Sequence, residues 1–132
     1  MVKIIYPTTD KIIEYNLIIL NIIKVKKADK PRVLSYEKIK KVIDECKKCN
    51  GDIYDKSAVL LKGLIQTHPF ASGNRRTAFI VTKEFIIINK EKFRIKDDPA
   101  QSKIMLGIRE SFYSDKEIKE WIKNGKIRKF ER

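Results

Sequence analysis

The sequence has few of the residues that form disulfide bonds or bind metals in small domains, with two cysteines and one histidine in 132 residues. Cys46 and Cys49 lie one helical turn apart, and no second cysteine pair or nearby histidine completes the four ligands of a zinc site. We therefore predict two ordinary reduced thiols. Glycine (five) and proline (four) are also few, and they form no linker or low-complexity segment. Without such a boundary or an internal repeat, residues 1–132 are predicted to form a single domain.

A long uninterrupted hydrophobic run is also missing. Glu14, Asn16 and Asn21 interrupt the most apolar stretch, residues 12–25, which is too short and too polar to span a bilayer. No signal peptide is recognisable. We expect a cytoplasmic protein without a membrane partner.

Acidic residues are scarce relative to basic ones. Lys and Arg number 30 against 17 Asp and Glu, which gives a formal net charge of +13 and favours anionic partners. However, the basic residues are scattered in blocks of no more than two, and neither a recognition helix nor an aromatic-rich basic segment is present. We therefore interpret the positive charge as that of a solvated surface. Nucleic acid is an unlikely partner, and a basic helical nucleic-acid-binding protein is the least favoured alternative.

Strand patterns are rare, and helical periodicity dominates the chain. Capping signals at Ser35, Asp98 and Ser114 and stop signals at Gly51 and Gly125 place the helix ends. The expected fold is all-α, a compact bundle of about six helices over residues 9–25, 35–49, 57–67, 74–89, 98–110 and 114–125.

Two of these helices are strongly apolar and are predicted to be largely buried. The stripe of the first contains Ile12, Ile13, Leu17, Leu20 and Ile23, and that of the fourth contains Ala78, Val81, Phe85 and Ile88.

Residues 68–76, His-Pro-Phe-Ala-Ser-Gly-Asn-Arg-Arg, carry the most chemistry in the chain. His68, the only histidine, can accept a proton from a hydroxyl at neutral pH. Pro69 stiffens the turn that follows, and Phe70 is predicted to anchor the loop in the core. This part of the motif supplies a base on a fixed loop.

The second half of the motif, residues 73–76, has the residue types that bind an anion. Gly73 allows close approach of the backbone to a ligand, and the helix expected to begin at Asn74 directs free N–H groups toward it. Arg76, with possible help from Arg75, can grip phosphate oxygens in a bidentate manner. These parts suit phosphoryl or nucleotidyl transfer.

This set of residues resembles the Fic/Doc family, whose signature is His-Pro-Phe-x-(Asp/Glu)-Gly-Asn-(Gly/Lys)-Arg. Six positions match it directly, and Thr77-Ala78 continues the version found in death-on-curing (Doc) proteins; the likeness extends over about residues 55–124. The matching residues are His68, Pro69, Phe70, Gly73, Asn74 and Arg76.

The resemblance implies a compact helical fold and a transferase that uses ATP to modify a hydroxyl of a target protein. His68 would be the general base, Gly73, Asn74 and Arg76 would hold phosphate, and the acidic residue of the signature would carry Mg²⁺. Family members with Gly before the final Arg transfer a nucleotidyl group, whereas the Doc branch has Lys and phosphorylates a translation elongation factor. Arg75 is nearer to the Doc branch, so phosphorylation is favoured and AMP transfer is the alternative.

Two departures from the family pattern affect this expectation. Ser72 occupies the acidic position, and a hydroxyl is a poor magnesium ligand compared with a carboxylate. Either another acid replaces it, with Asp52 and Asp55 nearest in sequence, or the domain is a degenerate module that binds a nucleotide or a partner. No Ser or Thr is followed four residues later by Glu, as in the inhibitory helix of self-restrained Fic proteins. Restraint by a small antitoxin packed over the cleft is therefore expected, as in toxin–antitoxin pairs.

Overall fold

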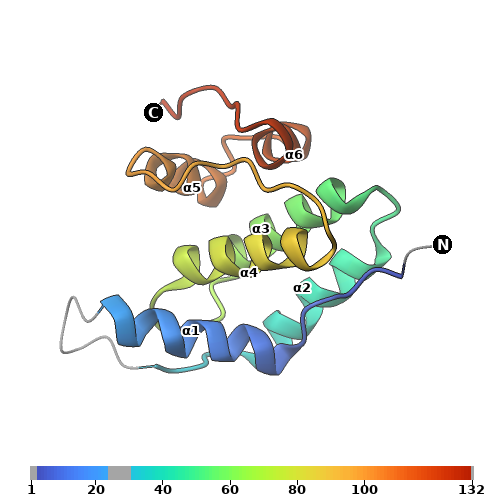
Figure 1. Ribbon diagram of the computed structural model, residues 1–132. Helices are drawn as coiled ribbons and strands as arrows, with labels where there is room; N and C mark the ends of the chain where they lie inside the picture. Colours follow the sequence, from blue (N-terminus) through green and yellow to red (C-terminus); the bar gives the residue numbers. More distant parts are fainter. Residues whose placement is uncertain (1–2, 24–30, 132) are drawn as a thin grey trace.

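The computed structural model describes residues 3–23 and 31–131, and this part of the chain folds into helices without a strand (Figure 1). An isolated bridge pairs Val33 with Phe70. The all-α prediction is therefore confirmed. The helices are α1 (Thr9–Ile23), α2 (Tyr36–Lys48), α3 (Ile53–Thr67), α4 (Asn74–Ile88), α5 (Gln101–Arg109) and α6 (Asp115–Asn124).

Helix α3 is the centre of the fold and packs against α2, α4, α5 and α6. Helix α1 packs against α4 and α2. In Figure 1, α5 and α6 lie on one side of the α3–α4 pair and α1 lies on the other. The ends of α3 and α4 joined by residues 68–73 thus lie within reach of α1.

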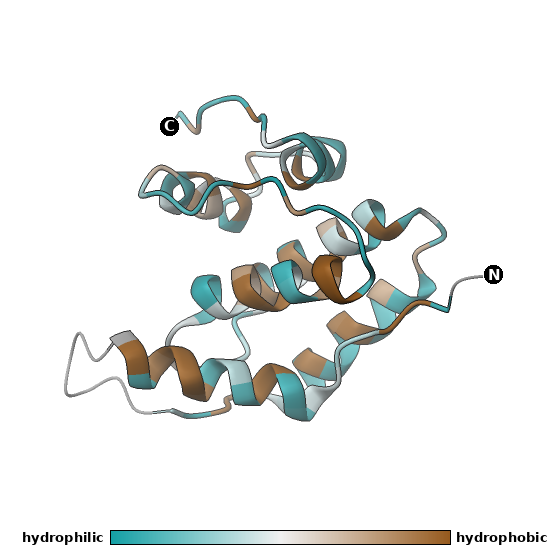
Figure 2. Cartoon of the chain, in the orientation of Figure 1, coloured by the Kyte–Doolittle hydropathy of each residue, from teal (hydrophilic) through white to brown (hydrophobic). Residues whose placement is uncertain are grey.

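The apolar first helix is only half buried, which corrects the prediction. Ile12, Asn16, Ile19 and Leu20 face inward, but Leu17, Ile18 and Ile22 are 41%, 44% and 76% exposed. The physical reason is that α4 and α2 cover one face of α1, so its other apolar residues face solvent. Figure 2 shows that apolar residues recur along the length of α1. The predicted residues 24–25 of this helix lie outside the described residues.

The fourth helix follows its predicted stripe except at its last position. Ala78, Val81 and Phe85 are at most 2% exposed, whereas Ile88 is 44% exposed at the end of α4. None of the helices among the described residues is long and apolar enough to cross a membrane.

Helix α3 begins at Ile53, four residues before the predicted start at residue 57. Asp52 caps it by accepting hydrogen bonds from the N–H groups of Tyr54 and Asp55, and the Asp55 carboxylate accepts one from the Asp52 N–H. This reciprocal pair is a capping box with Asp in the place of Ser and Glu, so residues expected to be a link form the first helical turn.

Helix α5 begins later than predicted. Asp98 accepts a hydrogen bond from the N–H of Ala100, and the carbonyls of Asp98 and Pro99 accept from the N–H groups three residues ahead. These i→i+3 bonds make a tight turn before the helix rather than its first α-helical turn. The caps predicted at Ser35 and Ser114 are confirmed.

Both cysteines are free thiols. Burial in the core raises the pKa of the Cys46 thiol to about 12. The thiolate is the reactive form, so this side chain acts as a small apolar group of the core.

Lys56 is a buried charge that closes the end of α2. Its side chain is 6% exposed, and its ammonium donates hydrogen bonds to the carbonyls of Cys46, Lys47 and Cys49. These carbonyls belong to the last turn of α2 and its cap, where backbone acceptors lack helical partners.

We expect Lys56→Met to lower the free energy of unfolding by about 2–3 kcal/mol, because charge-assisted hydrogen bonds to these carbonyls are lost. Urea denaturation measures this change. Lys62→Met is the matched control, since it removes an ion pair of a partly exposed lysine with Asp115 and is expected to cost less than about 1 kcal/mol. Equal losses in the two variants would contradict the role given to Lys56.

Candidate functional site

The loop of residues 68–73 is closed by its own side chains. Phe70 is 1% exposed in the core, as predicted. Asn74, itself 6% exposed, accepts a hydrogen bond from the Phe70 N–H (2.9 Å) and donates one to the Phe70 carbonyl (2.8 Å). Phe70 thus fixes the centre of the loop through both its ring and its main chain.

A second segment braces the outer side of this loop. The Pro69 carbonyl accepts hydrogen bonds from the N–H groups of Leu34 (2.8 Å) and Ser35 (3.2 Å). The Ala71 N–H donates to the Arg32 carbonyl at 3.0 Å. Three main-chain hydrogen bonds therefore tie the loop to the segment that precedes α2.

Helix α1 supplies a third brace through Asn16. Its amide nitrogen donates to the Ser72 carbonyl (3.0 Å) and to the Thr77 hydroxyl (3.1 Å), and the residue is 2% exposed. Sequence reasoning missed this role and counted Asn16 only as an interruption of an apolar run. A lone Asn on the buried stripe of a helix is the signal that indicates such a contact, because buried amides need partners.

Gly73 has a left-handed backbone, with φ +77°, at the N-cap of α4. A Cβ atom there would lie 3.2 Å from Leu20 Cδ2 and 3.3 Å from Asn16 Nδ2. The requirement for glycine therefore comes from its backbone conformation and from close packing against α1. No side chain caps α4, so its first N–H groups have no side-chain acceptor.

His68 is the C-cap of α3, and its side chain is exposed. Its backbone is left-handed (φ 53°, ψ 59°), a conformation that is uncommon for residues other than glycine and asparagine. The bonds of Pro69 and Phe70 described above hold the loop that follows it. The imidazole is thus accessible to solvent on a fixed support.

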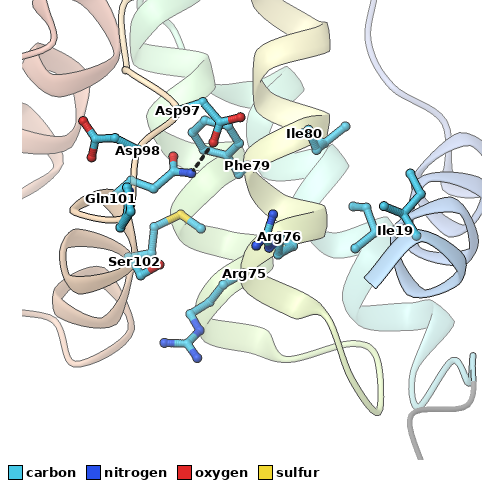
Figure 3. Close-up of a pocket in the computed structure, with 12 residues that line it drawn as sticks. Ile19, Arg75, Arg76, Phe79, Ile80, Asp97, Asp98, Gln101 and Ser102 are labelled. Carbon is cyan, nitrogen blue, oxygen red and sulfur yellow. Dashed lines mark hydrogen bonds between the residues drawn. The ribbon is translucent and has the colours of Figure 1, made fainter. Parts of the chain in front are cut away.

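Arg75 and Arg76 are exposed on the first turn of α4 and line a cleft of about 600 Å³. The other walls are Ile19 and Ile22 of α1 and the segment of residues 97–105, including Asp97 (Figure 3). His68 is not among the described residues that line this cleft. The structure therefore brings the two arginines together in a cleft and places the histidine on the adjoining loop.

The described side chains do not fit a magnesium ion. They contain no group of three or more His, Cys, Asp or Glu residues that could hold a metal, and the motif itself offers the neutral Ser72. Asp97 and Asp98 line the cleft, but Asp97 accepts a hydrogen bond from Gln101 (Figure 3) and Asp98 one from the Ala100 N–H.

The two acids that the sequence offered as replacements lie at the wrong end of α3. Asp52 is the N-cap of this 15-residue helix and His68 is its C-cap, so about 22 Å of helix separates them. Lys119 also lies 3.7 Å from the Asp52 carboxylate and 3.1 Å from that of Asp55. They serve as a capping box and ion pair and do not reach the motif.

Comparison with models of protein families matches residues 24–86 to the Fic/DOC family. This range includes the whole motif of residues 68–76. No curated protein that was compared matches the chain. Together with the helical fold, the family-model match supports the placement of this chain in the Fic/Doc family.

Proposed function

We propose that this protein is a Fic-type transferase that uses ATP to modify a hydroxyl group of a target protein, and that it transfers the γ-phosphoryl group as the Doc branch does. The observation that carries the proposal is the placement of an exposed histidine on a braced loop that leads into a cleft with two arginines. Phosphoryl transfer depends mainly on positioning and on neutralisation of charge, and this arrangement supplies both.

In the proposed reaction, His68 accepts the proton of the target hydroxyl as the hydroxyl oxygen attacks the γ-phosphorus. A new P–O bond forms to the target, and the bond between the γ-phosphorus and the bridging oxygen breaks. ADP leaves with the electron pair of that bond. The products are a phosphorylated target, ADP and a proton that is first held on His68.

The phosphates of ATP are assigned to the first turn of α4. Arg75 and Arg76 provide paired N–H donors for phosphate oxygens, and the uncapped N–H groups of this turn add the positive end of the helix dipole. Asn74 acts on Phe70 instead, and so positions the loop between the base and the phosphates. Gly73 permits the turn between them.

The residue before Arg76 is the basis for preferring phosphate over AMP transfer. Arg75 is bulky and cationic, like the Lys of the Doc branch, and it is exposed on the cleft wall. AMP transfer is the second candidate, since Arg76 and the start of α4 are common to both branches. A degenerate module that binds a nucleotide or partner is the third, favoured by Ser72.

We assign the cleft beside Arg75 to a restraining partner as well as to the nucleotide. Its α1 wall includes Ile22, which is 76% exposed. A small antitoxin with apolar and acidic side chains would cover both the isoleucines and the arginines. The target is proposed to be a translation elongation factor, as for the Doc branch.

Transfer of radioactive label from ATP tests the reaction. The protein is incubated with a cell extract and ATP labelled at either the α or the γ phosphate. We expect label in a protein band with γ-labelled ATP alone. Label from the α position would show AMP transfer and contradict the role of Arg75, and an absence of label from either position would favour the degenerate module.

Replacement of Ser72 by Asp tests whether the neutral residue limits nucleotide binding. We expect Ser72→Asp to strengthen ATP binding about tenfold in the presence of Mg²⁺ and not in its absence, because a carboxylate is a much better magnesium ligand. Isothermal titration calorimetry with and without Mg²⁺ measures this, with Ser72→Asn as the neutral control. Unchanged affinity in Ser72→Asp would mean that this position does not face the bound phosphates.

A further inference from the structure

A basic surface lies apart from the motif, where the α4–α5 connection meets α6 and the C-terminal segment. Two adjoining hollows of about 740 Å³ and 580 Å³ share Lys126 in their walls. We call this region the terminal basic surface and define it by Lys92, Arg94, Lys96, Lys123, Lys126 and Lys129.

The positive charge of this surface is not neutralised within the fold. All six side chains are exposed. None of them forms an ion pair with another residue in the part of the chain that the structure describes. Glu91 and Glu120 line the first hollow and Asp98 lines the second, so the basic groups outnumber the acidic ones. Arg94 donates a hydrogen bond to the Lys123 carbonyl, and the Lys123 ammonium lies 5.8 Å from the centre of the Tyr54 ring. Neither contact is an ion pair, so an anionic ligand is attracted without breaking one.

The two hollows differ in their walls. Lysines and Arg94 dominate the first, whereas the second also has apolar walls from Ile104, Ile127 and Phe130. These three side chains are half-buried, so part of each faces the hollow. The two hollows therefore place cationic side chains next to an apolar recess.

We propose that the terminal basic surface binds single-stranded nucleic acid. Proteins that bind single strands combine a positively charged groove along the backbone with aromatic side chains on which bases stack. Here the two hollows supply the cations, and Phe130 is an aromatic ring in the apolar recess. The bases of a duplex are stacked and cannot enter the apolar recess, so the single strand is the favoured form. An acidic protein would also match the charge, but it has no base to place in the apolar recess.

Fluorescence anisotropy with a fluorescein-labelled 12-nucleotide oligothymidylate tests this proposal. The variant Lys96→Gln/Lys126→Gln/Lys129→Gln is compared with Lys38→Gln/Lys41→Gln/Lys48→Gln, which makes the same change in net charge on exposed positions of α2. We expect the first variant to bind about tenfold more weakly. The slope of log K against log salt should fall in magnitude by about 2, since each phosphate contact to a single strand contributes about 0.7.

Several outcomes would overturn the proposal. Equal losses in the two triple variants would show that net charge alone attracts the oligonucleotide. Tighter binding of polyglutamate would identify an acidic protein as the ligand, and tighter binding of a 12-base-pair duplex would exclude the single-strand preference. Melting temperatures of both variants verify that they fold. His68→Asn is expected to keep full affinity for the oligonucleotide, so this proposal and the transferase proposal can fail separately.

Discussion

His68→Asn is expected to reduce transfer of label from γ-labelled ATP by about 10²- to 10⁴-fold, the usual contribution of a general base. The reason is that an amide cannot accept the proton of the attacking hydroxyl at neutral pH. Asparagine is chosen because the backbone of His68 is left-handed, with φ 53°, and asparagine tolerates this conformation better than alanine. The substitution therefore removes the imidazole and leaves the backbone as it is.

The controls separate loss of the base from loss of the site. Thermal unfolding of His68→Asn should match that of the unaltered protein, since the imidazole is exposed and the loop is held by main-chain bonds. Affinity for ATP should also stay within about threefold, because His68 does not line the cleft. Full transfer activity in a folded His68→Asn protein would rule out this residue as the base.

Asn74→Ala is expected to lower the free energy of unfolding by about 2–6 kcal/mol. The Phe70 N–H and carbonyl lose their partners at a buried position, and each unsatisfied buried group costs about 1–3 kcal/mol. Such a loss is a large part of the stability of an ordinary domain. Urea denaturation at several temperatures measures it.

Asn74→Asp provides the matched comparison, because a carboxylate still accepts from the Phe70 N–H but cannot donate to its carbonyl. We expect Asn74→Asp also to lower the free energy of unfolding and to displace the loop. Asn124→Ala, at an exposed position of α6, should change stability by less than about 0.5 kcal/mol. If Asn74→Ala kept its stability but lost affinity for ATP, Asn74 would contact phosphate directly, and its assignment as a loop-positioning residue would be wrong.

The regular parts of this protein could be predicted from local sequence. Helical periodicity and the caps at Ser35 and Ser114 act over a few residues, so they fix where most helices lie whatever surrounds them. Asp52 shows the limit, because its capping box with Asp55 moved the start of α3 to Ile53. The motif of residues 68–76 was equally readable, since its spacing is local and the helix start at Asn74 agrees with it.

Long-range packing brings together side chains that are far apart in the sequence. Asn16 braces Ser72 and Thr77 from 56 and 61 residues away, and such partners have no local signal. Asp52 and Asp55 are close to the motif in sequence, but the length of α3 separates them from it.

Long-range packing also sets which apolar side chains are exposed and where charged side chains gather. Leu17 of α1 is predicted to be buried, yet it is 41% exposed because the described helices cover only one face of α1. The basic residues of segments 92–96 and 123–129 come together at the terminal basic surface only after α6 packs on α3 and the α4–α5 connection passes beside it. The helices and the motif could be predicted because they depend on residues that are close in sequence. The contacts around the motif and the exposed surfaces could not, because they depend on long-range packing of the folded chain.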